Sequence, residues 1–181
     1  MQCTALPRRR RGTGGVSRRV RALHAGRSPV TKLAQLKAVY DELAKKQLKV
    51  GFFEHSKYPD GTPVAYVAAI QELGYPAGGI PPRPFMRPAM TEHKPEYSNL
   101  IVRAVKAAVK GNIAITDGLT QVGAKAAGDV KMVIKSVTTP PLKDTTVAAR
   151  ARRHSKGKAT SKPLVDSGLM LQSVTFAVED K

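Results

Sequence analysis

The sequence is poor in cysteine, in aromatic residues and in acidic residues. Cys3 is the only cysteine among 181 residues, which excludes an intramolecular disulfide framework and a zinc site built from several cysteines. Tryptophan is absent and aromatic residues make up 5% of the chain, so we expect no aromatic platform on which nucleic-acid bases stack. With 41% hydrophobic residues the chain can still bury a core, filled mostly by Ala, Val, Leu and Ile.

Long apolar runs are also missing. The longest uninterrupted run, residues 64–70, is far short of the ~20 residues that cross a bilayer, so we expect no membrane span. The basic start of the chain does not contain the apolar stretch of about 7 to 15 residues found in secretory signals. An Arg-rich, acid-free start is compatible with an organellar transit peptide, but we prefer a plain basic arm.

Positive charge is what the chain has in excess: 31 Lys and Arg against 13 Asp and Glu, a formal charge of +18. Residues 1–29 contain eight arginines and no acid, which predicts a flexible basic arm that is either solvated or bound to a polyanion. Phosphates are the natural partner of charge without base-reading elements, and such binding weakens steeply with salt. The possible DNA contacts are Arg8, Arg9, Arg10, Arg11, Arg18, Arg19, Arg152, Arg153, Lys156 and Lys158.

Residues 30–181 are predicted to form one α+β domain, with a small mixed or antiparallel sheet packed by several helices. Apolar residues spaced three and four apart predict helices at about 31–47, 95–110, 116–137 and 145–153. Thr62 as cap and Pro63 in the first turn predict a short helix that ends at Gly74. Alternating apolar residues predict strands at 48–53 and in the second half of 169–178. Small residues such as Gly123 and Gly128 make helix 116–137 thin, which favours close approach by another helix.

Residues 76–88 contain five prolines, which predicts an extended loop and excludes a helix or a central strand. Ile80, Phe85 and Met86 in this segment are apolar and are not expected to remain in water. A stiff segment loses little entropy on docking, so it can serve as a contact for a neighbouring subunit. The alternative is that its side chains fold back onto the chain's own core.

Few residues have the pattern of a catalytic or metal site. The four histidines are dispersed, without the short spacing of a zinc pair. Glu54 and His55 are neighbours on a predicted strand and so point to opposite faces. The sequence therefore predicts no enzyme, no cofactor and no metal site, although a pocket that brings His55 or His93 near a carboxylate would favour an enzyme.

Several blocks of the sequence, in matching order over about residues 30–178, carry a family resemblance. They are residues 50–52, 58–74 and 80–89, the helix with Gly123, residues 139–142, Thr146, Arg150 and residues 163–169. Together they resemble the tail-completion and neck proteins of tailed bacteriophages, a group that includes the lambda minor tail protein Z type and related virion-morphogenesis proteins. The most specific part runs from Gln-Glu-Leu-Gly at 71–74 to Arg-Pro-Phe at 83–85. Residues 1–28 do not match the family.

The resemblance implies a non-enzymatic structural subunit of the virion neck or tail, assembled in the host cytoplasm. It implies a homo-oligomeric ring, often hexameric, at the junction of tail and head. The implied partners are a tail terminator or tail tube protein, head connector proteins and genomic DNA passing through the lumen. The rival interpretation is a basic nucleic-acid-binding protein that acts as a monomer in the cytoplasm.

Resemblance and composition point to one subunit interface in the proline-rich segment. Phe85 is the expected apolar anchor, flanked by arginines as in many interface hot spots. Arg83 or Arg87 would pair across the boundary, and Glu72 is an acidic partner for one of them. The complete set is Glu72, Ile80, Arg83, Pro84, Phe85 and Arg87. On this hypothesis Phe85→Ala leaves the monomer folded and abolishes ring assembly.

Overall fold

The computed structural model describes residues 29–153 and 161–181, which form an α+β fold of seven α-helices, one 3-10 helix and two strands. The predicted fold class is confirmed. The elements in chain order are α1 (Pro29–Lys45), β1 (Lys46–Gly51), α2 (Val64–Leu73), η1 (Pro76–Gly78), α3 (Met86–Glu92), α4 (Lys94–Val109), α5 (Ile115–Ser136), α6 (Asp144–Arg153), α7 (Leu169–Ser173) and β2 (Thr175–Asp180). The predicted contacts at residues 8–19, Lys156 and Lys158 lie outside the described residues.

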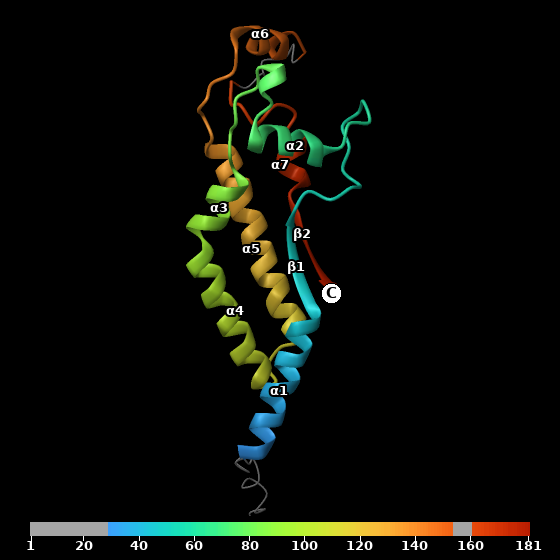
Figure 1. Ribbon diagram of the computed structural model, residues 1–181, viewed down its shortest axis with the longest axis vertical. Coiled ribbons are helices and arrows are strands. Elements are labelled where there is room, and N and C mark those ends of the chain that lie inside the picture. The colour runs from blue at the N-terminus through green and yellow to red at the C-terminus, as the bar shows by residue number, and fades with distance from the viewer. Residues whose placement is uncertain (1–28, 154–160) are drawn as a thin grey trace, which may run out of the picture.

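Helix α5 is the central element of an elongated molecule (Figure 1). Helix α4 packs along one side of α5 and the two strands along the other, while α2, α6 and α7 gather at the upper end. The buried residues of α5 recur every three or four positions, among them Leu119, Val122, Ala126, Val130 and Ile134. An apolar stripe of this width lets one helix serve as core for neighbours on both sides.

Two hydrophobic clusters lie along α5. The larger one is at the upper end, where Val64, Phe85, Val130 and Val174 are each at most 1% exposed. The smaller one, at the lower end, joins Ala104, Val105 and Ile115 to the inner side of α1. The upper cluster therefore ties α2, α3 and the approach to β2 to the C-terminal half of α5.

Strands β1 and β2 form an antiparallel pair whose register runs from Lys46 opposite Asp180 to Gly51 opposite Thr175. We call this two-stranded pair the β-ribbon. One of its faces lies on α5 at Gly123, where Leu48 and Phe176 come close to the helix backbone. Gly123 is thus where the helix is thin, as predicted, but the element that approaches it is the sheet and not another helix.

A methyl group at Gly123 is expected to push the β-ribbon off α5. Its Cβ would lie 2.5 Å from Cδ2 of Phe176 and 2.8 Å from Cδ1 of Leu48, so the packed ring must move. We expect Gly123→Ala to lower the free energy of unfolding by about 1–3 kcal/mol. Gly128→Ala, on the same helix but facing open space, should raise it by up to about 1 kcal/mol because glycine weakens helices. Urea denaturation of both variants tests this, and equal shifts would contradict it.

Several local predictions are wrong at the ends of elements. Residues 76–88 are not a continuous extended loop, since they contain η1 and the first turn of α3, with Pro88 as its third residue. Proline is tolerated there because amides in the first turn have no partner within the helix. Thr62 does not cap α2, since Pro63 occupies the N-cap position without a side-chain hydrogen bond.

A one-turn helix, α7, precedes β2, where only a turn and a strand were expected. Among residues 29–153 and 161–181, no helix has both the length and the apolar character needed to cross a membrane.

Candidate functional site

The carboxylate of Glu72 holds the N-terminus of helix α3. It is 9% exposed, and its Oε2 accepts hydrogen bonds from the amides of Phe85 at 2.6 Å and Met86 at 2.9 Å. Its Oε1 accepts the amide and the Nε–H of Arg87, each at 3.1 Å. A side chain from α2 therefore satisfies three amides that α3 leaves free at its positive end, which is a favourable place for an anion.

The protonation of Glu72 is shifted by these contacts. Burial raises the pKa of the Glu72 carboxyl, but the three amides and the Arg87 guanidinium together outweigh burial and lower this pKa below its ordinary value. Glu72 is therefore a bound carboxylate at neutral pH. It does have an arginine as partner, as predicted, but Arg87 belongs to the same chain and the contact is internal.

Arg83 ties the proline-rich segment 139–142 to α2. It is 4% exposed, with Nε–H donating to the Pro140 carbonyl at 2.8 Å and Nη2–H to the Pro141 carbonyl at 2.9 Å. Its Nη1 donates to Gln71 at 3.3 Å, and its amide donates to the Gln71 carbonyl at 2.7 Å. The planar guanidinium reaches several acceptors at once, which an ammonium group cannot do in this geometry.

The expected interface at Phe85 is wrong for this conformation, because Phe85 is 1% exposed in the upper cluster. Its ring packs edge-on against Phe52, with centroids 6.0 Å apart and planes at 90°. The hydrogen-bond partners of Glu72 and Arg83 likewise lie within the same chain. Of the six predicted interface residues, Pro84 and Arg87 are exposed and Ile80 is half-buried, and only these three remain for contact with another molecule.

Arg150 is a third buried charge with an internal role. It is 7% exposed and donates to the carbonyls of Lys162 at 2.8 Å, Pro163 at 3.0 Å and Val165 at 3.2 Å. The sequence does not reveal this role, because charge alone does not distinguish a solvated arginine from one that holds a loop.

Arg152 and Arg153, the predicted DNA contacts that the structure describes, are exposed at the end of α6. Arg153 pairs with Asp166 at 3.1 Å beside a cleft of about 440 Å³. Among the described residues that line this cleft there is neither histidine nor cysteine. The cleft also presents Asp60 and Asp166, so its charge is mixed rather than strongly positive.

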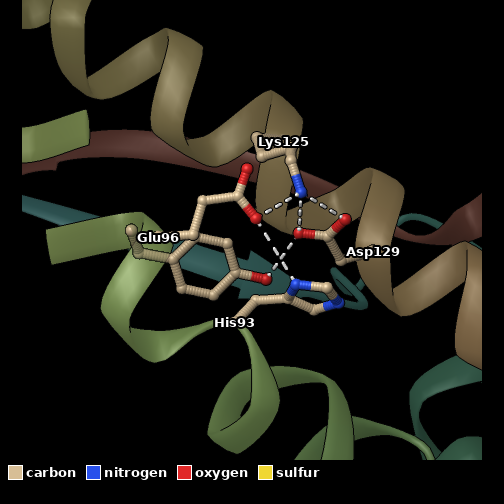
Figure 2. A network of polar contacts seen from close by, with 5 residues as sticks. His93, Glu96, Lys125 and Asp129 are labelled. Carbon is tan, nitrogen blue, oxygen red and sulfur yellow. Dashed lines mark hydrogen bonds and ion pairs between the residues drawn. The ribbon is translucent and has the colours of Figure 1, made fainter. Parts of the chain in front are cut away.

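A network of polar side chains joins α4 to α5 (Figure 2). The Lys125 ammonium donates to both oxygens of Asp129 at 2.7 and 2.8 Å and to Glu96 at 3.1 Å. The Tyr97 hydroxyl donates to Asp129 at 2.9 Å, and His93 Nδ1 lies 3.4 Å from Glu96. Burial and the bond to Asp129 raise the pKa of Tyr97, while the bond to Asp129 raises the pKa of Lys125.

The same network has three metal-ligating groups, His93, Glu96 and Asp129, whose ligand atoms lie within 4.8 Å of one another. Lys125 already donates to both carboxylates, so a metal ion would have to displace this ammonium group. His93 does lie near a carboxylate, but it does not line the cleft beside Arg153. His55 lines a second cleft, of about 480 Å³, together with Glu54 and Glu179. His55 lies in a turn after β1, stacked on Phe53, so the strand expected at Glu54 and His55 is wrong.

Removing the Lys125 ammonium is expected to destabilise the packing of α4 on α5. In Lys125→Met the buried Asp129 carboxylate keeps Tyr97 but loses its cation, and we expect about 1–2 kcal/mol less free energy of unfolding. Lys131→Met, on the same helix and without a side-chain partner among the described contacts, is the control and should change it by less than about 0.5 kcal/mol. Thermal unfolding of the two variants at pH 7 measures the difference, and equal loss in both would argue against the network.

Comparison of the chain with protein-family models, with curated proteins and with solved structures finds no match.

Proposed function

We propose that this chain is a non-enzymatic structural protein of a tailed-phage virion, which forms an oligomeric ring at the head-to-tail junction and helps join tail to head. One observation carries the proposal: the sequence blocks that resemble tail-completion and neck proteins contact one another. Glu72 of one block binds the amide of Phe85 in the next, and Arg83 binds the carbonyls of Pro140 and Pro141. The blocks that carry the resemblance are thus joined by hydrogen bonds in the folded chain.

The buried charges support a structural role. Glu72, Arg83 and Arg150 direct their hydrogen bonds mainly at backbone groups of loops and of a helix end. Groups satisfied in this way fix the path of the chain, and they are not free to exchange protons with a substrate.

The test is assembly of the purified full-length chain. Light scattering and negative-stain microscopy should show closed rings of several copies, with a hexamer as the expected size and a lumen wide enough for duplex DNA. Adding the tail tube or terminator protein of the same phage should give a stacked complex. A chain that stays monomeric in these experiments and is missing from purified virions would overturn the proposal.

The second candidate, a monomeric nucleic-acid-binding protein, is favoured by the formal charge of +18. It requires tight binding before any oligomerisation, with an affinity that falls steeply as salt rises. Filter binding of the full chain to duplex DNA at low and physiological salt distinguishes this candidate from the ring-forming protein.

Replacing Arg8, Arg9, Arg10 and Arg11 by Ser should weaken DNA binding if the arm contacts phosphates, and unchanged binding would exclude that role.

A further inference from the structure

We propose that the β-ribbon is the contact between ring subunits, with the free edge of β2 in one copy pairing with the free edge of β1 in the next. This inference rests on the proposed ring-forming function and names the surface that closes the ring.

Neither edge of the ribbon is paired with a further strand, because the sheet in the described part of the chain has two strands. The Lys181 amide donates to the Lys45 carbonyl at 2.8 Å, so these two residues form a hydrogen-bonded pair of the ladder. Hydrogen-bonded and non-hydrogen-bonded pairs alternate along an antiparallel ladder. The backbone groups of Leu48 and Val50 on β1, and of Phe176 and Val178 on β2, therefore point away from the partner strand.

Neither strand is protected by a bulge or by proline, since the register is continuous over six residue pairs and neither strand contains proline. Both strands do carry charged residues, which disfavour pairing with a strand of like charge. One face of the ribbon is fixed on α5 at Gly123, so the edges are held in an extended shape. An open, regular edge is a template for an additional strand.

The charges of the two strands differ in sign, which identifies the partner. β1 carries Lys46 and Lys49, whereas β2 carries Glu179 and Asp180. Within the chain these residues pair as Lys46 with Asp180 at 2.8 Å and Lys49 with Glu179 at 2.6 Å. An added β1 strand beside β2 would meet the same acidic residues, so a second copy of this chain fits the edge.

Charge also selects the geometry of the assembly. Pairing β1 with β1 or β2 with β2 of another copy would bring no lysine opposite an acid, since β1 carries lysines without acids and β2 carries acids without lysines. Pairing β2 with β1 repeats the attraction found within the chain. This contact is head to tail and uses different surfaces on the two copies, the arrangement that generates a ring when its rotation closes.

Disulfide trapping of single-cysteine variants tests the pairing in the full-length chain. In a Cys3→Ser background, Gln47→Cys is mixed with Glu179→Cys to test the register used within the chain, and with Ala177→Cys to test a register shifted by two residues. These side chains lie on the face away from α5 and would form non-hydrogen-bonded pairs between copies, whose Cβ atoms are close enough for a disulfide. Ser98→Cys, exposed on α4, is the control partner.

We expect one of the two mixtures to give several-fold more disulfide-linked dimer, within rings, than either variant alone or the Ser98→Cys mixture. Rings that form without a disulfide in either mixture, or with disulfides only between identical variants, would overturn the edge pairing and leave the proposed function standing. Failure to form rings under any condition would overturn both. With Cys3 retained, an intrachain disulfide from Cys3 to Gln47→Cys would assign the edge to residues 1–28 and overturn the pairing of copies.

Discussion

Phe85→Ala is expected to lower the free energy of unfolding by about 3–5 kcal/mol, the usual cost of removing a buried aromatic ring. Phe85 is 1% exposed, contacts Phe52 edge-on and lies among Val64, Val130 and Val174. Truncation removes apolar contacts and leaves a cavity between α3, α2 and α5. Because the whole stability of a domain is about 5–15 kcal/mol, the variant should be largely unfolded at modest urea concentrations. Urea titration followed by circular dichroism measures this.

Tyr66→Ala is the matched control for the loss of an aromatic ring. Tyr66 is 61% exposed, so its removal should change the free energy of unfolding by less than about 0.5 kcal/mol. The interface hypothesis makes the opposite prediction for Phe85→Ala, namely a stable monomer that cannot assemble. A wild-type urea midpoint together with lost assembly would therefore return Phe85 to the subunit interface.

Glu72→Gln is expected to cost about 2–4 kcal/mol, because it replaces a carboxylate that accepts four hydrogen bonds by an amide of the same shape. The amide NH₂ group cannot accept, so at least one backbone amide at the start of α3 loses its partner. Glu42→Gln, an exposed change on α1, is the control and should have little effect on the urea midpoint. Equal midpoints for the two variants would show that the Glu72 contacts do not stabilise the fold.

The same substitution should change the response to acid. The pKa of Glu72 is lower in the folded chain than its unfolded value of about 4.3, so its contribution to stability is complete above that pH. The contribution is lost as pH falls from about 4.3 through the lower folded pKa. Unfolding free energies measured across this window should fall more steeply in the wild type than in Glu72→Gln. Parallel curves would show that Glu72 is not the source of the acid sensitivity.

The longer helices were predicted well because their signal is local, whereas the short helices α3 and α7 were not predicted. The predicted helix at 31–47 is α1 at Pro29–Lys45, and the one at 116–137 is α5 at Ile115–Ser136. Each follows from apolar residues that recur with the period of a helix, which a short window of sequence contains in full. Gly74 as the end of α2 was predicted for a similar reason, since its positive φ of 81° suits glycine.

The contacts of single residues were predicted less well. Gly123 indicated close approach, but small size does not say whether a helix or a sheet comes near. Pro88 indicated a break, yet it lies in the first turn of α3, where its missing amide costs little. The polar network at Lys125 gave no sequence signal beyond the Lys-Asp spacing of four, since its partners on α4 lie some thirty residues away in the chain.

The sequence by itself determined the charge of +18, the α+β class and the course of the main helices, because composition and periodicity are properties of the chain alone. Only the tertiary structure decided whether Phe85, Glu72 and Arg83 are buried inside the chain or exposed at its surface. An aromatic residue flanked by arginines is equally suited to an interface and to a core. The choice depends on remote partners, the carbonyls of Pro140 and Pro141 and the apolar face of α5, which enclose these residues once the chain has folded.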